Sequence, residues 1–207
     1  MRMLAIECAT GACSLALFER AGASWSLIDS RHEMLGRGHA EHLVPMIASL
    51  PDRGRAADIR VSLGPGSFTG VRIGLAAARA LGLAWGADVK GYPTLALVAA
   101  TARAQRRGPV SVCMTGGHGE WFVQDFAADG TPEQEACSIA PGASKGAWNH
   151  TVIAGDRAQD KAALEGAAHI PLHLLPHARF VAGLPRESFT DHLTPIYGRG
   201  PDARLPA

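Results

Sequence analysis

A group of histidines and glutamates between residues 32 and 42 raises the question of a metal site. It comprises His32, Glu33, His39, Glu41 and His42. Because His39 and His42 are three residues apart, both can lie on one face of a helix. The H-E-x-x-H zinc motif is absent, since Met-Leu-Gly follows the His-Glu pair. We therefore expect solvated or helix-capping histidines here and no metal ligands.

The glycine-rich segment 64–74, GPGSFTGVRIG, is the second candidate for chemistry. Glycines allow close backbone approach, a serine or threonine can cap a following helix, and free amides at a helix start can hold an anion. The glycine spacing is one residue too long for a dinucleotide fingerprint, and no lysine follows as in a P-loop. Two readings stay open: a tight turn without ligand, or an anion-binding loop formed by Gly64, Gly66, Ser67, Thr69 and Gly70.

Nucleophilic and thiol chemistry find little support in the sequence. Ser67 lies in P-G-S-F-T-G, not in the G-x-S-x-G pattern of a hydrolase elbow. The four cysteines form no C-x-x-C pair, so we expect reduced thiols. We expect no catalytic residue and no resident metal in this chain.

Composition limits the class of partner. The 207 residues carry 20 Lys and Arg against 19 Asp and Glu, so bulk charge does not indicate a nucleic-acid binder. No apolar run approaches the roughly 20 residues of a membrane span, and the apolar start is too short for a signal peptide. We expect a cytoplasmic protein that does not contact a membrane.

Alternating and helical patterns predict a mixed α/β chain with no internal sequence repeat. We expect strands at Met3–Cys8, Cys13–Phe18, Ser24–Ser30, Ile59–Leu63, Val89–Tyr92, Val110–Met114, Trp121–Phe126 and Val152–Ala154. We expect helices at His39–Leu50, Val71–Trp85, Pro93–Gln105 and Arg157–Leu164, a weak one at Arg179–Leu184, and a partly loose tail from Pro195.

The helix that follows the glycine-rich loop has an unusual abundance of small side chains. Nine of the seventeen residues from Gly70 to Gly86 are Gly or Ala. At about 100° per residue, small residues gather on one side and Leu75, Leu81 and Trp85 on the other. A side with few long side chains allows another helix to approach closely. From the pattern alone, packing inside its own domain and packing against a partner are equally favoured.

Several segments together resemble the TsaB (YeaZ) family. These are GPGSFTG with its R-I-G helix, the opening MLAIECATGACSLALF, the segment GHAEHLVPMI at 38–47, and the P-I-Y-G-R run at 195–199. The resemblance implies an actin/Hsp70/sugar-kinase-like (ribonuclease H-like) fold. It implies an N-terminal domain at 1–107, with an antiparallel meander and the dimerisation helices, and a reduced C-terminal α/β domain at 108–207.

The resemblance also implies a function. Such a chain is a non-catalytic subunit that binds and activates TsaD, with TsaE as a third member, in threonylcarbamoylation of the adenosine beside the anticodon in tRNA. It forms a homodimer when alone, contacts tRNA at most indirectly, and leaves ATP and metal to its partners. The implied interface residues are Leu43, Met46, Ile47, Leu50, Gly70, Ile73, Gly74, Ala76, Ala77, Ala80 and Ala84.

The chain departs from the family pattern at two places. Glu7 stands where the family usually has Asp, and Thr115–Gly119 replaces a segment with an acidic residue and two arginines. No complete ATP site is visible in the sequence. Two alternatives remain: an ATP-dependent phosphotransferase or metallopeptidase of the same fold class, and a self-contained homodimeric scaffold.

Overall fold

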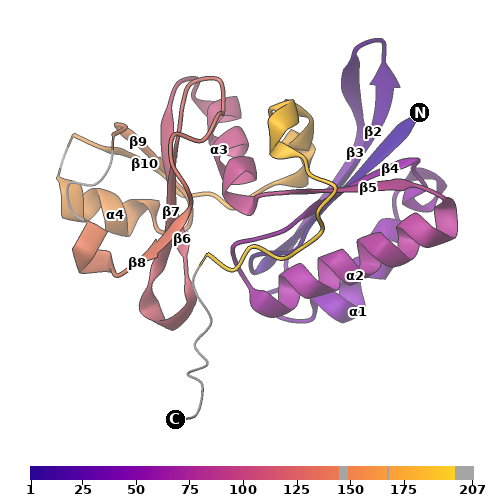
Figure 1. The fold of residues 1–207 in the computed structure, drawn as a ribbon, viewed down its shortest axis with the longest axis horizontal. Helices are drawn as coiled ribbons and strands as arrows, with labels where there is room; N and C mark the ends of the chain where they lie inside the picture. The colour runs from indigo at the N-terminus through magenta and orange to yellow at the C-terminus, as the bar shows by residue number, and fades with distance from the viewer. Residues whose placement is uncertain (145–148, 167, 199–207) are drawn as a thin grey trace.

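Two five-stranded sheets form the framework of the computed structural model, which describes residues 1–144, 149–166 and 168–198 (Figure 1). The first sheet has the order β3-β2-β1-β4-β5. β1, β2 and β3 form the expected antiparallel meander, and β4 and β5 lie parallel to β1. The strands are β1 (Arg2–Glu7), β2 (Ala12–Ala21), β3 (Ser24–Met34), β4 (Asp58–Ser62) and β5 (Asp88–Tyr92).

The second sheet repeats this plan in shorter strands. Its order is β10-β9-β6-β7-β8, again a meander followed by two parallel strands. Its strands are β6 (Val110–Thr115), β7 (Trp121–Phe126), β8 (Cys137–Ile139), β9 (Val152–Ala154) and β10 (Ile170–Leu172). The expected α/β class is confirmed, and the topological repeat is present although no sequence repeat is. We call the two sheets with their helices the first and second units.

The outer face of the first sheet is covered by α1 (His39–Ala48) and α2 (Phe68–Trp85). Because side chains alternate along a strand, Leu4 and Ile6 of β1 face these helices, while Met3 and Ala5 face the second unit. Both sets are buried. The opposite faces of β1 therefore serve two separate cores.

Helix α3 (Thr94–Gln105) lies between the two sheets (Figure 1). Every residue from Thr94 to Ala102 is buried, as expected for a helix surrounded by protein. Its leucines and valine join one hydrophobic cluster with Phe18 of the first sheet and Phe126 of the second. On the far side of the second sheet, α4 (Ala158–Glu165) packs on Ile153 and its neighbours.

Several elements differ from the sequence expectations. β3 continues to Met34, beyond the expected end at Ser30, because it pairs with β2 up to that residue. The weak helix at Arg179–Leu184 is the 3-10 segment η4 (Ala178–Gly183). The short strands β8 and β10 were not predicted. The other 3-10 segments are η1 (Pro51–Gly54), η2 (Gly117–Gly119), η3 (Pro141–Ser144) and η5 (Arg186–Ser188).

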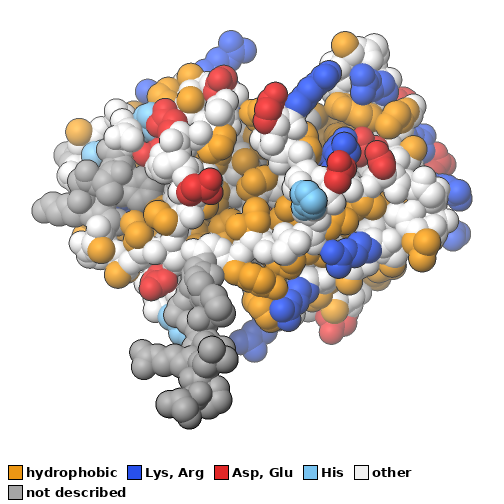
Figure 2. Space-filling model, viewed as in Figure 1, with side chains coloured by type: hydrophobic (Ala, Val, Ile, Leu, Met, Phe, Trp, Pro, Cys, Tyr) orange, Lys and Arg blue, Asp and Glu red, His pale blue; other side chains and the backbone are white. Residues whose placement is uncertain are grey.

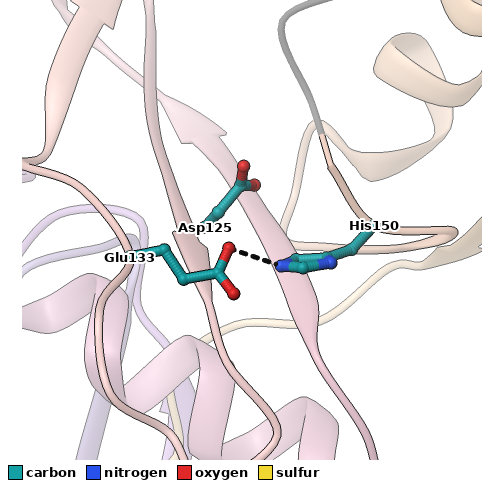
Figure 3. A group of neighbouring side chains, drawn as sticks. All are labelled: Asp125, Glu133 and His150. Atoms are coloured by element: carbon teal, nitrogen blue, oxygen red, sulfur yellow. Dashed lines mark hydrogen bonds and ion pairs between the residues drawn. The ribbon is translucent and has the colours of Figure 1, made fainter.

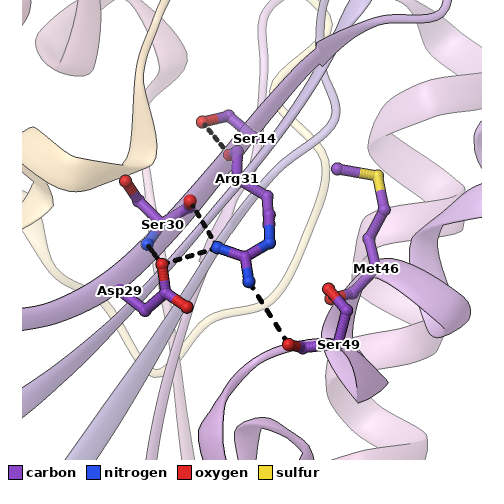
Figure 4. A network of polar contacts seen from close by, with 6 residues as sticks. All are labelled: Ser14, Asp29, Ser30, Arg31, Met46 and Ser49. Atoms are coloured by element: carbon purple, nitrogen blue, oxygen red, sulfur yellow. Dashed lines mark hydrogen bonds and ion pairs between the residues drawn. The ribbon is translucent and has the colours of Figure 1, made fainter.

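Arg31 of β3 fastens the edge of the first sheet to the end of α1 (Figure 4). Its guanidinium donates to the Asp29 carboxylate at 2.5 Å and to the Ser49 carbonyl at 3.3 Å. Ser49 is the C-cap of α1, and the last turn of this helix contains no basic residue. Arg31 thus supplies a positive charge where the last carbonyls of a helix need donors.

The C-terminal segment returns to the first unit. Gly91 and Thr190 exchange two backbone hydrogen bonds, and the Ile196 amide donates to the Leu63 carbonyl at 2.7 Å. The part of the expected loose tail that is described, up to Gly198, is therefore docked; residues 199–207 lie outside the described residues. The predicted boundary at 107/108 falls between α3 and β6, and this division stays a prediction. None of the helices in the described chain is long and apolar enough to span a membrane.

We expect Leu97→Ala to destabilise the whole protein, because the fully buried Leu97 side chain belongs to the core that both sheets share. Truncating a buried leucine costs about 2–5 kcal/mol of the free energy of unfolding. Urea denaturation monitored by circular dichroism measures the loss. Leu83→Ala is the matched control, since Leu83 is 89% exposed. Equal stabilities of the two variants would contradict the assignment of α3 to the shared core.

Candidate functional site: the exposed side of α2 and the cleft beside it

The glycine-rich loop is pressed against the end of β1. A Cβ atom on Gly66 would lie 2.1 Å from the Ala9 carbonyl oxygen, and one on Gly70 would lie 2.0 Å from that of Cys8. Both distances are far below any real contact, so only glycine fits. The Ser67 amide completes the contact by donating to the Ala9 carbonyl at 2.7 Å.

Two of the loop's amides are already engaged within the chain. The Ser67 amide binds Ala9, and the Gly70 amide donates to the Ser67 side chain at 3.2 Å. Ser67 is thus the N-cap of α2, as expected for Ser67 or Thr69, and the helix begins at Phe68 instead of Val71. The role of Gly64, Gly66, Ser67, Thr69 and Gly70 in anion binding stays a prediction. Tight packing explains the glycines at 66 and 70 without it.

Helix α2 turns its glycines inward and three of its alanines, Ala76, Ala80 and Ala84, outward. Gly70, Gly74 and Gly82 are buried against the sheet together with Leu75, as expected for the leucine. The expected position of Gly70 and Gly74 on the partner-facing side is therefore wrong. At Gly70 the Cys8 carbonyl comes too close for a larger residue, whereas at Gly74 a Cβ would meet the Cys8 and Val61 side chains at ordinary contact distances. The exposed residues on the outer side are Arg72, Ala76, Arg79, Ala80, Leu83 and Ala84.

The remaining interface candidates on α2 divide into two groups. Ile73 and Ala77 are half-buried and pack against the core of the first unit. Ala76, Ala80 and Ala84 are exposed and have only methyl side chains. Leu83, 89% exposed beside them, was not singled out in the sequence because a leucine in an amphipathic helix is normally assigned to the core.

The four candidates on the preceding helix need correction. Leu43, Met46, Ile47 and Leu50 are at most 6% exposed and belong to the core between α1, α2 and the sheet. They cannot contact a partner in this conformation, because their side chains anchor α1 to its own domain. The exposed apolar side chains of α1 are those of Ala40, Val44, Pro45 and Ala48.

Glu7, the acidic residue of the first hairpin, is enclosed within the first unit. It is fully buried, and one carboxyl oxygen, Oε1, accepts hydrogen bonds from the Ala9 amide at 2.7 Å and the Ser62 hydroxyl at 3.0 Å. Among the described residues, its Oε2 has no partner. Burial raises the pKa of Glu7 to about 7, because the loss of solvation outweighs the two hydrogen bonds, which by themselves lower the pKa.

The histidines that suggested a metal site have separate positions. His39 is buried, with its Nε2 atom 3.3 Å from the Ala12 carbonyl, so it is a core residue instead of a solvated one. His32 stacks on His177, with 4.5 Å between ring centroids, and burial lowers the pKa of both, that of His177 to about 4. His42 is exposed.

A cleft of about 570 Å³ lies where the start of α2 faces the second unit. The first unit contributes residues 9–11 and 65–68, and the second contributes residues 114–117 and Asp156. The Asp156 carboxylate accepts from the amide and hydroxyl of Thr115, at 2.8 and 2.6 Å. Hydrophobic side chains also gather in the middle of the face seen in Figure 2. A second pocket, of about 430 Å³, has Leu63, Phe126 and Ile196 among its lining residues.

An aromatic group at the mouth of the first cleft was not predicted. Phe68 and Tyr197 are 54% and 45% exposed, with 5.6 Å between ring centroids. Arg72 links them, because its guanidinium lies 3.5 Å from the Phe68 ring centroid and donates to the Tyr197 hydroxyl at 3.1 Å. The contact joins residues 125 positions apart, so helical spacing could not reveal it.

We expect Gly70→Ala to lower the free energy of unfolding by about 1–3 kcal/mol, since the new methyl group collides with the Cys8 carbonyl. This loss should outweigh the roughly 1 kcal/mol that alanine gains over glycine in a helix. Urea denaturation measures it. In the control, Gly117→Ala, the new Cβ meets no described atom within 4 Å. A stabilised Gly70→Ala variant would show that the glycine is not sterically required.

We expect Glu7 to make stability depend on pH. Because the native carboxyl has a pKa of about 7 against an ordinary 4.5, the folded state holds the proton more tightly than the unfolded chain. The free energy of unfolding should therefore fall by about 3 kcal/mol as pH rises from 4.5 to 7, and not recover above it. Glu7→Gln should remove this fall, whereas the exposed Glu19→Gln should retain it. Urea denaturation from pH 5 to pH 8 tests the difference.

Solved structures share this fold. A Pseudomonas aeruginosa protein described as similar to the peptidase YeaZ superposes with a TM-score of 0.79 at 24% identity, covering 96% of this chain and 99% of that one. The structure described as YeaZ from Pseudomonas aeruginosa gives a TM-score of 0.75, also at 24% identity, with 95% and 99% covered. The expected fold class is confirmed.

Sequence comparisons identify the family. The chain is 40% identical over 97 residues to the Escherichia coli tRNA threonylcarbamoyladenosine biosynthesis protein TsaB, and 36% identical over 110 residues to that of Haemophilus influenzae. These matches cover 43% and 51% of this chain but only 38% and 42% of the relatives' length. The family model of TsaD, tRNA N6-adenosine threonylcarbamoyltransferase, matches residues 32–182. The chain therefore belongs to the TsaD family and, within it, to the TsaB/YeaZ type.

Proposed function

We propose that this chain is a non-catalytic subunit that binds TsaD and activates it in the threonylcarbamoylation of tRNA. The relatives' name, which refers to tRNA threonylcarbamoyladenosine biosynthesis, and the TsaD family model support a role in this pathway. The sequence matches span only about two fifths of the length of the curated relatives. The activation of TsaD and the choice of TsaD as partner are therefore what we propose.

The exposed alanine side of α2 carries the proposal. Ala76, Ala80 and Ala84 follow one another at intervals of four residues, the spacing of a ridge along a helix. Their methyl groups let a second helix approach to the short end of the usual 8–10 Å between axes. Leu83, next to this strip, offers an apolar side chain that a partner would remove from water. The strip is thus suited to a helix of TsaD.

The enclosure of Glu7 supports a non-catalytic role. A carboxylate that handles nucleotide or metal must face the cleft, whereas the Glu7 carboxyl is buried and hydrogen-bonded to Ala9 and Ser62. The Asp156 carboxylate in the cleft is held by Thr115. Both acids thus have structural partners, which favours a subunit over an ATP-dependent phosphotransferase or a metallopeptidase.

We expect Ala80→Trp to abolish co-elution with TsaD, because the indole would hold the partner helix away from the alanine strip. Ala80 is a better site than Ala77, which packs on its own core. The matched control is Ala163→Trp on α4, where the alanine is also exposed but belongs to the second unit. Size-exclusion chromatography of co-expressed proteins measures binding, and circular dichroism checks folding. Co-elution of Ala80→Trp at the wild-type level would refute this interface.

The same proposal includes TsaE as a third member and a homodimer when the chain is alone. If the homodimer uses the alanine strip, Ala80→Trp should convert it to a monomer in sedimentation experiments. Calorimetry of the isolated chain with ATP distinguishes the binding subunit from the ATP-dependent phosphotransferase. A subunit that relies on its partners for ATP should not bind ATP tightly by itself. Stoichiometric, tight ATP binding to the isolated chain would favour the phosphotransferase.

A further inference from the structure

Three side chains that can bind a metal meet at one corner of the second unit (Figure 3). Asp125 lies near the end of β7, Glu133 in the turn that follows, and His150 shortly before β9. One ligand atom from each residue lies within 4.8 Å of the others. This corner and the cleft lie at opposite ends of β6 and β7. Thr115, which lines the cleft, pairs with Trp121 at one end of the two strands, whereas Asp125 pairs with Ser111 near the other end.

The Asp125 carboxylate indicates that a cation belongs there. The residue is fully buried, and its Oδ2 atom accepts a hydrogen bond from the side-chain Nδ2 of Asn149 at 3.2 Å. Its Oδ1 atom is buried and has no hydrogen-bond partner within the described part of the chain. A buried carboxylate oxygen without a donor or a cation is costly, so such an atom commonly marks a missing ligand.

The other two residues do not compensate this charge. The His150 Nε2 atom lies 2.9 Å from a Glu133 carboxylate oxygen, with side-chain exposures of 12% and 35%. A protonated His150 would balance one of the two carboxylates, and a neutral one would balance neither. The three side chains therefore retain at least one negative charge when both acids are ionised.

We propose that Asp125, Glu133 and His150 bind one divalent transition-metal ion of the zinc type. An imidazole nitrogen with carboxylate oxygens suits Zn²⁺, whereas Mg²⁺ and Ca²⁺ prefer oxygen ligands alone. In a tetrahedral site, bonds of about 2.0–2.2 Å put two ligand atoms roughly 3.3–3.6 Å apart, so ligand atoms that lie within 4.8 Å of one another draw together when the ion enters. Glu133 and His150 lie outside the strands and can make this adjustment.

The ion would replace the Glu133–His150 hydrogen bond. Zinc takes the lone pair of Nε2, so any proton on that nitrogen leaves to solvent. Three protein ligands leave a fourth position for water in a tetrahedral site. The ion would hold the turn at Glu133 and the segment at His150 against β7, stabilising the second unit. This inference does not depend on the function proposed above.

Equilibrium dialysis of the full chain against ZnCl₂, followed by elemental analysis, tests the site. The wild type should bind one equivalent in this site, and Asp125→Asn and His150→Ala should each lower the affinity about tenfold or more. His42→Ala is the matched control, since His42 is an exposed histidine on α1 and should bind as wild type. Zn²⁺ should raise the melting temperature of the wild type and of His42→Ala, but not that of the two site variants.

Two results would overturn the site. The first is wild-type zinc affinity in His150→Ala. The second is loss of binding in Cys137→Ser with retention in His150→Ala, which would place the ion on the Cys137 thiol of β8. Circular dichroism establishes that each variant is folded. If Asp125→Asn does not fold, His150→Ala decides the question, because His150 lies outside helices and strands.

Discussion

The contact between the glycine-rich loop and the end of β1 determines where much of the first unit lies. With hydrogen in place of a side chain at Gly66 and Gly70, the loop backbone rests directly on the carbonyls of Ala9 and Cys8. The start of α2 is thereby fixed beside the cleft, and the rotation of the helix about its axis follows. Gly74 and Gly82 are then turned to the sheet, and Ala76, Ala80 and Ala84 to the surface. The close contact at Gly66 and Gly70 therefore determines both where α2 lies and which of its side chains are exposed.

The candidate site combines surfaces of different chemistry. The alanine strip is apolar and nearly flat, whereas the adjoining cleft contains the Asp156–Thr115 pair and the aromatic group of Phe68 and Tyr197. A partner that covers the strip would also approach this aromatic group, because Phe68 is the first residue of α2. The enclosure of Glu7 removes the hairpin acid from this surface. This arrangement supports the proposed role as a binding subunit.

The sequence predicted the α/β class, the N-terminal meander and most helices, because these depend on local periodicity. It could not predict that Gly70 and Gly74 of α2 face inward while Ala76, Ala80 and Ala84 face outward, since glycine and alanine are both small and only the surroundings in the fold distinguish them. Leu43, Met46 and Ile47 of α1, and Leu50 just after it, were assigned outward for a different reason: a helix between a sheet and a partner has two candidate apolar faces. Asp125, Glu133 and His150 have no recognisable spacing, because a hairpin and a separate segment bring them together.

The return of the chain to the first unit has a mechanical consequence. The two units are connected once through Tyr92 and Pro93 into α3, and again through the segment that contains Thr190. Because Gly91 and Thr190 exchange hydrogen bonds of 2.8 and 3.0 Å, these two connections form a short antiparallel ribbon. A paired ribbon resists twisting more than a single strand does. Two connections joined by this bridge therefore restrain rotation of one unit about the other more than a single connection would.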